Sequence, residues 1–328
     1  MQLNSRGIAW VVAVVTAACF SGPAAAQDEQ PYLTITTGSP SGTYYRFARE
    51  IAEMLPSTMR LDIAESEGSV QNLRRLIGYE GQSEQKYYQL AMVQADVLDQ
   101  LRNRAKGDEV LETIVGRIKV VMPLYNEEIH AFSQASMGLN SIEDLLDDSI
   151  LVNAGGEKSG TNLTARWLFE QIGETERTFD WANVPDEAGL PNIGNGYDVL
   201  FSVAGAPSNL GRSIEPNQDV TLVPIEVPAL YDLENSPYRP AILTRDVYPW
   251  LQDDVKTMAV TALLVAFDYD ENNPYCELIE RLTLAILDGL AFRQEPGGGH
   301  PKWRDVDKVN AQNRSDLYAC AERALNAR

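Results

Sequence analysis

Residues 32–56, YLTITTGSPSGTYYRFAREIAEMLP, decide the fold of this 328-residue chain. The segment opens with a β-rich run, 32–38, that ends in a glycine. Apolar residues then recur at the spacing of one helix face, at Tyr44, Phe47, Ala48, Ile51 and Met54. Pro56 stops this helix. A strand, a glycine-rich turn and an amphipathic helix follow one another, which is the repeating unit of an α/β protein.

The same unit recurs twice in the residues that follow. Residues 60–66 alternate like a strand, and a helix with one apolar face runs from there to Gly78. Residues 89–96 form a third strand, with a helix through Leu101 after it. The order β-α-β-α-β-α predicts a mainly parallel sheet with right-handed crossovers.

A long β-rich stretch, residues 113–134, divides this series from a second one. It has about two strand lengths, which suits a segment that runs out of one lobe into another. The second series is expected to contain strand 149–155, helix 161–172 and strands near 198–207 and 220–227.

The C-terminal part returns to the first lobe. Residues 232–245 are predicted to be a connection, followed by strand 257–267, helix 274–292 and a last helix from about Asn310. We therefore expect an α/β fold with two lobes, divided as follows: 27–124 with 235–328 as lobe 1, and 125–234 as lobe 2. Two lobes joined by crossings leave a cleft between them, the usual place for a ligand.

The N-terminus predicts export. Residues 8–20 are an apolar run of secretory length, and Ala24 and Ala26 form an Ala-x-Ala cleavage pattern, so we expect a signal peptide over 1–26. A lipoprotein site at Cys19 is an alternative, although Thr16 stands where such sites prefer an aliphatic residue. The expected location is the periplasm.

Charge and composition exclude several classes of partner and site. The formal net charge of −20 disfavours binding to nucleic acid or anionic lipid. The sequence lacks C-x-x-C, and His130 and His300 stand alone, so no metal and no cofactor is expected. In an exported chain Cys276 and Cys320 form a disulfide or remain two buried thiols.

Residues 152–173, VNAGGEKSGTNLTARWLFEQIG, resemble a phosphate-binding loop at first sight. The nucleotide interpretation fails because Thr161 stands where the P-loop lysine is required. A serine nucleophile is disfavoured because the chain has no G-x-S-x-G elbow. An anion cradle remains: Ser159 is a good N-cap, Gly160 lets a ligand approach, and the first amides of the helix point outward. Ordinary helix capping by Ser159 is the alternative.

Two further strand-to-helix turns share this design, at 36–45 and 65–72, with Ser69 as a candidate cap. All three turns follow the carboxyl ends of strands, where ligands bind in open α/β sheets. Tyr44 fits either the core or the cleft, and Tyr45 points elsewhere and could line the cleft. Gln94 ends the third strand as a neutral polar group suited to orienting a small ligand.

The chain resembles the TAXI family, the extracytoplasmic solute-binding proteins of TRAP transporters. Six stretches carry the resemblance in order, over nearly the whole mature chain: TITTGSPSGTYYRFAREIAEML, ESEGSVQNLRRL, LAMVQADVL, KSGTNLTARWLFEQIG, VAGAP and YPWLQDDVKTMAV. The resemblance implies a type II periplasmic-binding-protein (Venus-flytrap) fold with a ligand cleft between its lobes. It also implies a small organic anion, such as glutamate or a 2-oxo or dicarboxylic acid, and TRAP membrane subunits, small and large, separate or fused, as partners.

Carried over position by position, the resemblance suggests these ligand-binding residues: Ser39, Thr43, Tyr44, Ser69, Asn72, Gln94, Ser159, Gly160, Thr161, Gly205 and Pro207. The chain departs from the family pattern at Lys158, in residues 79–88, and at Gln89, which stands near a customary Asp. It departs again in LTRDVYPW, before the Tyr-Pro pair.

The sequence as a whole predicts a non-catalytic receptor. Two other functions remain open. One is the ligand-sensing component of a signalling system. A sensor kinase gene nearby would favour this function, whereas a permease gene would favour transport. The other is a periplasmic hydrolase, which turnover of esters or amides would support.

Overall fold

A computed structural model describes residues 30–78, 87–173, 189–233 and 236–328 of the chain. The predicted signal peptide, the lipoprotein alternative at Cys19 and most of the atypical stretch 79–88 lie outside these described residues. Pro31–Arg328 forms one compact unit. No helix within the described ranges is long and apolar enough to cross a membrane.

The first half contains the three predicted β-α units, which are confirmed. Their bounds are β1 Tyr32–Thr36, α1 Thr43–Met54, β2 Arg60–Ala64, α2 Ser69–Leu76, β3 Leu90–Gln94 and α3 Ala95–Ala105. Of the apolar positions that set the helical period of α1, Tyr44, Phe47, Ala48 and Ile51 are buried and Met54 is partly buried. Burial of this stripe explains why the 32–56 pattern folds as a strand followed by a helix.

The long β-rich stretch begins later than predicted. Residues Glu109–Gly116 form helix α4, and Asp108 caps it by accepting hydrogen bonds from the amides of Val110 and Leu111. β4 then runs over sixteen residues, Ile118–Ser133. The expected strand start at 113 was wrong because the cap at Asp108 starts a helix in residues that are β-prone by composition.

The second half keeps the predicted order with shorter strands. Its elements are η1 Ala135–Met137, η2 Ile142–Leu146, β5 Val152–Asn153, α5 Gly160–Gln171, η4 Leu190–Asn192, β6 Val199–Ala204, α6 Asn209–Arg212, β7 Thr221–Leu222 and η5 Pro228–Leu230.

The C-terminal part differs from the prediction at one strand. Residues expected to be a plain connection contain β8, Tyr238–Leu243, which pairs antiparallel with β9, Val255–Phe267. Pro240 marks β8 as an edge strand, where a missing backbone donor is tolerated. The remaining elements are α7 Pro274–Gln294, η6 Pro301–Asp305, α8 Lys308–Gln312 and α9 Ala319–Ala327.

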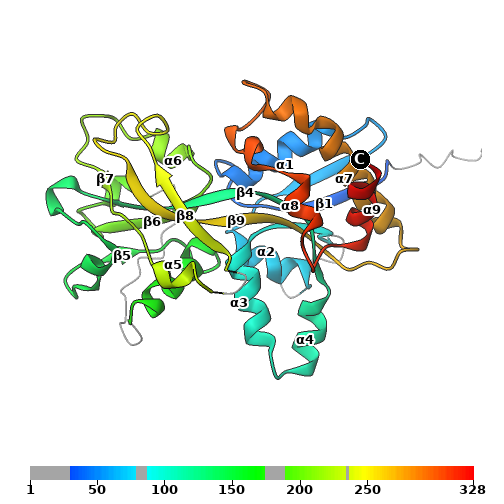
Figure 1. Ribbon diagram of the computed structural model, residues 1–328, viewed down its shortest axis with the longest axis horizontal. Helices are drawn as coiled ribbons and strands as arrows, with labels where there is room; N and C mark the ends of the chain where they lie inside the picture. The colour runs from blue at the N-terminus through cyan, green and yellow to red at the C-terminus, as the bar shows by residue number, and fades with distance from the viewer. Residues whose placement is uncertain (1–29, 79–86, 174–188, 234–235) are drawn as a thin grey trace, which may run out of the picture. The chain divides into compact units, whose positions relative to one another are not determined.

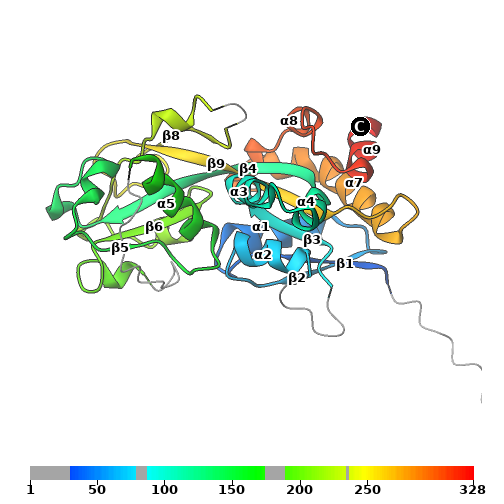
Figure 2. The ribbon, with the colours of Figure 1, turned by 90° about the horizontal axis from the view of Figure 1, so that it is seen from below.

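The sheet is mixed rather than mainly parallel. Its order is β2-β1-β3-β9-β4-β6-β5, with β7 on β4 and β8 on β9. The β-α units give the parallel pairs, β1 with β2, β1 with β3, and β5 with β6. Every pair that involves β4 or β9 is antiparallel. These two long strands run between the helix-covered halves, as Figures 1 and 2 show, so the crossing segments belong to the sheet itself.

Two cores cover the two faces of this sheet. In β3, Ala91 and Val93 face a core shared with α2, α3 and α5. Leu90 and Met92 face the opposite core, shared with α1, α7 and α9. The alternation follows from the pleat, because successive side chains of a strand point to opposite faces. Burial on both faces makes β3 a continuous apolar run.

A third, smaller core bears on the predicted lobes. Leu243 and Tyr248, assigned above to lobe 1, pack with Phe132 and Leu200. This packing favours grouping residues 243–251 with lobe 2. The lobe boundaries stay a prediction, because Pro31–Arg328 is a single compact unit.

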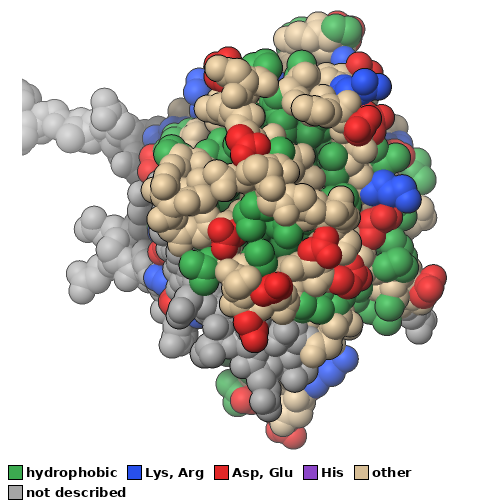
Figure 3. Space-filling model, turned by 90° about the vertical axis from the view of Figure 1, so that its left-hand side faces the viewer, with side chains coloured by type: hydrophobic (Ala, Val, Ile, Leu, Met, Phe, Trp, Pro, Cys, Tyr) green, Lys and Arg blue, Asp and Glu red, His purple; other side chains and the backbone are tan. Residues whose placement is uncertain are grey.

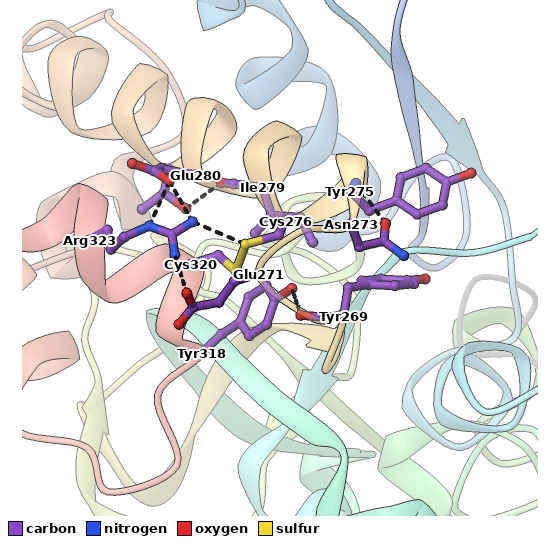
Figure 4. The surroundings of a disulfide bond; sticks show 11 residues. Tyr269, Glu271, Asn273, Tyr275, Cys276, Ile279, Glu280, Tyr318, Cys320 and Arg323 are labelled. Atoms are coloured by element: carbon purple, nitrogen blue, oxygen red, sulfur yellow. Dashed lines mark hydrogen bonds and ion pairs between the residues drawn. A yellow bond between two sulfur atoms is a disulfide. The ribbon is translucent and has the colours of Figure 1, made fainter.

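Cys276 and Cys320, for which the sequence left two alternatives open, are joined by a disulfide bond. The bond ties α7 to α9, and Arg323 lies beside it, donating to Glu280 Oε2 at 2.9 Å and to the Sγ of Cys276 (Figure 4). Acidic side chains are scattered over the face of the molecule seen in Figure 3, in keeping with the negative net charge.

Candidate functional site

A cavity of about 600 Å³ opens where the strands β1, β2 and β3 end and the helices α1, α2 and α5 begin. The turns after β1 and β2 form one wall, and Gly156 with the start of α5 forms another. Ser202 of β6 and Ser208 before α6 complete the lining. The three glycine-rich turns that the sequence singled out therefore meet in one place.

Eight of the eleven predicted ligand-binding residues line this cavity: Ser39, Thr43, Tyr44, Ser69, Gln94, Ser159, Gly160 and Thr161. Asn72, Gly205 and Pro207 are not part of the lining. The residues brought together are mostly hydroxyls, one amide and a glycine backbone, which can orient a small polar ligand by hydrogen bonds.

The other three predicted residues have structural surroundings. Asn72 is fully buried; its Nδ2 donates to the carbonyl oxygens of Thr37 and Met92, and its Oδ1 accepts from Thr36. It therefore ties the end of β1 to β3. A Cβ on Gly205 would stand 2.9 Å from the ring of Tyr125, so this glycine permits close packing. Pro207 follows a cis peptide bond outside the cavity.

The start of α5 has the predicted cap. The Oγ of Ser159 accepts from the amide of Asn162 at 3.1 Å and donates to the carbonyl of Gly156 at 2.7 Å. The amides of Gly160 and Thr161, at the first two helical positions, donate to no residue that the structure describes. The Thr161 hydroxyl accepts from the amide of Val203 at 3.1 Å. These free amides and the positive end of the helix favour a negatively charged group.

Ser69 is not the cap of α2, contrary to the prediction. Gly68 takes that position with a φ of 120°, a value that favours glycine, and no side chain caps the helix. The Oγ of Ser69 instead accepts from the amide of Gln94 at 3.1 Å and donates to its Oε1 at 3.3 Å. The side-chain Nε2 of Gln94 in turn donates to the Thr164 hydroxyl at 3.0 Å, so the side-chain amide of Gln94 is fixed in one orientation.

Two residues that the sequence connected with the site lie at its margin. Lys158 does not line the cavity; its Nζ lies 3.5 Å from Glu67 Oε1. Tyr45 lines a smaller cavity of about 290 Å³ next to Arg46 and Arg49. The two cavities share Pro40, Ser41 and Asn209 in their linings.

Glu127 is the lining residue that sequence reasoning missed. It lies in the middle of β4 with its side chain buried, and its Oε2 accepts a hydrogen bond from the Tyr44 hydroxyl at 2.7 Å. Burial raises the pKa of Glu127 to about 8 against the opposing effect of the Tyr44 hydrogen bond, and Asp96 and Glu128 add to the rise. The sequence signal that could have identified Glu127 is the pair of adjacent glutamates, 127 and 128, inside a long β-rich stretch.

Asp96 forms a second buried carboxyl beyond the lining. Its Oδ2 accepts from the hydroxyls of Thr164 at 2.6 Å and Tyr238 at 2.7 Å. Burial raises the pKa of Asp96 to about 6, although both hydrogen bonds act in the opposite direction. Because Thr164 also holds Gln94, this network supports the cavity wall from behind.

The two histidines of the chain lie outside the cavity lining. His130 is fully buried between the carbonyl of Glu128 and the hydroxyl of Tyr248, and burial lowers its pKa to about 4. Burial likewise lowers the pKa of His300 to about 4. Neither is positioned to act as a base in the cavity.

The charged residues of the lining are three carboxyl groups and one guanidinium: Glu65, Glu67, Glu127 and Arg75. Arg75 Nη1 donates to the carbonyl of Glu65 at 2.6 Å and to the Thr36 hydroxyl at 3.1 Å. The guanidinium is thus held against the β1 and β2 ends of the wall.

Comparison with known proteins gives a family and a fold. The family model described as "NMT1-like family" matches residues 35–323. The structure of the periplasmic binding protein BugD is similar, with a TM-score of 0.54 and 13% identity, over 91% of this chain and 95% of that chain. A protein from Bordetella bronchiseptica RB50 is similar over 90% of this chain and 89% of its own, at 14% identity and a TM-score of 0.51. The two-lobed α/β fold of periplasmic binding proteins is therefore confirmed.

Proposed function

Because the chain belongs to the NMT1-like family, we propose that it is an extracytoplasmic solute-binding receptor. It captures a small organic anion in the cavity and hands it to a TRAP membrane permease. We place it in the periplasm for two reasons. Its structural relative BugD is a periplasmic binding protein, and the predicted signal peptide would direct the chain there. The TRAP assignment rests on the resemblance to the TAXI family.

The observation that carries this proposal is the cavity itself. A volume of about 600 Å³ falls within the range of small-molecule sites. Its polar lining consists chiefly of hydroxyls and free backbone amides at the carboxyl ends of strands, where α/β proteins bind ligands. This chemistry suits recognition by hydrogen bonds rather than proton transfer.

The carboxylate of the ligand is assigned to the start of α5. The free amides of Gly160 and Thr161 point to this place, and the helix terminus adds a partial positive charge. Ser39 and Thr43 lie in the lining on the opposite turn. A carboxylate held between the two turns gains charge-assisted hydrogen bonds, which are stronger than neutral ones.

Ligand capture is coupled to closure of the cavity. Two hydrogen bonds cross it in this structure: Asn209 Nδ2 donates to the carbonyl of Ser41 at 2.6 Å, and the amide of Gln71 donates to the carbonyl of Lys158 at 3.1 Å. Opening would break both. A ligand that bridges the same walls favours the closed arrangement by its differential affinity for it.

A catalytic role has less support. Neither histidine of the chain is part of the lining. The seryl hydroxyls there hydrogen-bond to neighbouring side chains and backbone, as Ser39 does with Ser41 at 2.9 Å and Ser159 with Gly156. A serine nucleophile needs a base within hydrogen-bond reach.

A thermal-melt screen of the mature protein against amino acids, 2-oxo acids and dicarboxylates tests the proposal. A ligand at one hundred times its Kd should stabilise the protein by about 2.7 kcal/mol. Ser159→Ala should weaken binding of any hit. Ser141→Ala, which removes the cap of a helix away from the cavity, is the matched control and should leave binding unchanged.

A flat screen across all three classes would contradict the uptake of common carboxylates. The permease partnership is tested separately by the genes beside this one. A TRAP permease gene supports delivery, whereas a sensor kinase gene would contradict it and favour signalling.

A further inference from the structure

The carboxyl group of Glu127 has one oxygen engaged and one free. Glu127 is 3% exposed and lines the cavity. Its Oε2 accepts from the Tyr44 hydroxyl at 2.7 Å. Its Oε1 has no hydrogen-bond partner among the residues that the structure describes, and it is not sealed from the cavity. Because the carboxyl is buried and this oxygen opens on the cavity, a polar group of the ligand can supply its missing hydrogen-bond partner.

We propose that the free oxygen of Glu127 receives the ammonium group of the ligand, so that the cavity selects α-amino acids over 2-oxo acids and simple carboxylic acids. This inference rests on the proposed receptor function and names the class of its ligand. The assignment gives Glu127 a specificity role that neither the fold nor the carboxylate cradle requires.

Tyr44 and Ser69 lie between Glu127 and the start of α5, the two places that would bind the ligand. The Tyr44 hydroxyl lies 2.7 Å from Glu127 Oε2 and 3.5 Å from the Oγ of Ser69. The Oγ of Ser69 would lie 2.8 Å from a Cβ on Gly160, at the start of α5. An α-amino acid carries its carboxylate and its ammonium on one carbon. It can therefore place the carboxylate at α5 and the ammonium at Glu127.

The cations beside the lining are engaged away from Glu127. Arg75 is held by the backbone of Glu65 and the Thr36 hydroxyl, and Lys158 Nζ lies 3.5 Å from Glu67 Oε1. A 2-oxo acid or a dicarboxylate adds negative charge to this lining without a compensating group. An amino acid adds one ammonium for one carboxylate, and that cation meets the buried carboxyl.

Glu127 holds a proton until such a cation arrives. The ionisable groups that face it are Tyr44 from α1, Asp96 from the start of α3, Tyr125 and Glu128 from β4, and Lys302 from η6. The one cation among them, Lys302, is paired with Glu128 and Asp305. Burial and the two neighbouring carboxyls raise the pKa of Glu127 to about 8, so the carboxyl is neutral at pH 7.

Binding an amino acid then releases this proton. The protonated carboxyl and the ligand ammonium become a carboxylate–ammonium pair, and the proton leaves Glu127 for solvent. Affinity for an amino acid should therefore rise with pH, by up to about tenfold per unit, until pH 8. A ligand oxygen that accepts a hydrogen bond from the neutral carboxyl would show the opposite trend. The sign of the pH dependence distinguishes the two.

Calorimetry with matched pairs of probes tests this on the wild-type protein. The pairs differ only at C2: L-glutamate with 2-oxoglutarate, L-alanine with pyruvate, and L-leucine with 4-methyl-2-oxopentanoate. We expect the amino acid of at least one pair to bind at least about tenfold more tightly than its partner. Titrations at pH 7 in two buffers of different ionisation enthalpy should show release of close to one proton per ligand bound.

The variant Glu127→Gln keeps the size of the side chain but cannot lose a proton. It should weaken amino-acid binding about thirtyfold or more and abolish both the proton release and the pH dependence between pH 6 and 8. Glu143→Gln, at an exposed glutamate of η2, makes the same substitution outside the lining and should behave as wild type. If Glu127→Gln fails to fold, the proton release measured on the wild type still tests whether Glu127 loses its proton to pair with the ligand ammonium.

The outcomes distinguish a failure of the ammonium assignment from a failure of the proposed receptor function. Tighter binding of the 2-oxo acids, with affinity that falls as pH rises, would overturn the ammonium role and leave the receptor standing. Amino-acid binding without proton release would also overturn it. Binding by none of the six probes would overturn the inference together with uptake of common carboxylates.

Discussion

Gly160 occupies a position where the helix start and Gln94 leave no room for a side chain. A Cβ there would stand 1.4 Å from Gln94 Oε1. Gly160→Ala should displace the Gln94 amide, break its hydrogen bond to Thr164 and destabilise the protein by about 1–3 kcal/mol. Thermal or chemical unfolding measures this effect.

A matched glycine gives the control. Gly116 ends α4 and would meet nothing within 4 Å. Gly116→Ala should be neutral or stabilising by up to about 1 kcal/mol, because alanine is the better helix former. Destabilisation of similar size at both positions would show that packing against Gln94 is not the cause.

The buried carboxyl of Glu127 should also shape stability in the absence of ligand. Its pKa is about 8 in the folded protein against a usual 4.5, so the folded state binds a proton that the unfolded state has lost in that window. This contribution is fully present below pH 4.5 and is lost as pH rises to about 8. The slope should be at most about 1.4 kcal/mol per pH unit.

Glu127→Gln should flatten this decline and leave a protein more stable than wild type at pH 8. Melting between pH 6.5 and 8 isolates the effect. Asp96, with a pKa near 6, titrates below this range. His130 and His300, whose pKa values are lowered to about 4, lose their stabilising contribution only as pH falls below 6.5. Parallel stability curves for the variant and wild type would refute the assignment.

At the residue scale the sequence predicted the cap at Ser159 but not the surroundings of Asn72 and Glu127. Ser159 was recognisable because an N-cap needs only its own helix start. No local pattern in the sequence indicates that Glu127 lines the cavity whereas Asn72 does not. Asn72 turns inward to the backbone of β1 and β3, and Glu127 faces the cavity because β4 crosses behind it. Both outcomes depend on neighbours distant in the sequence.

Helix α6 reaches the turn before α1 through one side chain. The exposed Asn209 donates to the carbonyl of Ser41 at 2.6 Å across the cavity. Asn209→Ala should weaken ligand binding about two- to threefold, because a solvent-exposed hydrogen bond contributes about 0.5 kcal/mol. The melting temperature of the ligand-free protein should hardly change.

Titration of the best hit from the melt screen measures this change in Kd. Asn195→Ala, at an exposed asparagine outside the lining, serves as control. An unchanged Kd in Asn209→Ala would mean that closure does not depend on this contact.

Among the elements, the β-α units could be predicted and the edges of the sheet could not. Each β-α unit of the first half carries its own period, turn and stop signal. β8 contains Pro240 and exposed positions, so nothing local marks it as a strand; its pairing with β9 decides. The antiparallel pairs of β4 and β9 likewise come from segments more than 120 residues apart in the chain.

On the scale of the whole molecule, the disulfide links two helices that pack on one face of the sheet. Cys276 and Cys320 are 44 residues apart. Closing a loop of this length should stabilise the protein by about 4 kcal/mol. Reduction should therefore lower the melting temperature by several degrees.

The double variant Cys276→Ser with Cys320→Ser should melt at the temperature of the reduced wild type and should not respond to reductant. A wild-type melting temperature that is indifferent to reductant would argue that the helices need no covalent link. Ligand affinity should be unaffected, because neither cysteine lines the cavity.

The placement of Glu127 and Glu128 side by side on β4 has a consequence for how this protein can change in evolution. One carboxyl faces the cavity and the other pairs with Lys302 on the opposite side of the strand. A single-residue insertion or deletion upstream that shifted the register of β4 would turn each carboxyl to the opposite face, and only one of the two positions would keep a glutamate. Related chains should therefore hardly ever differ in the length of this strand.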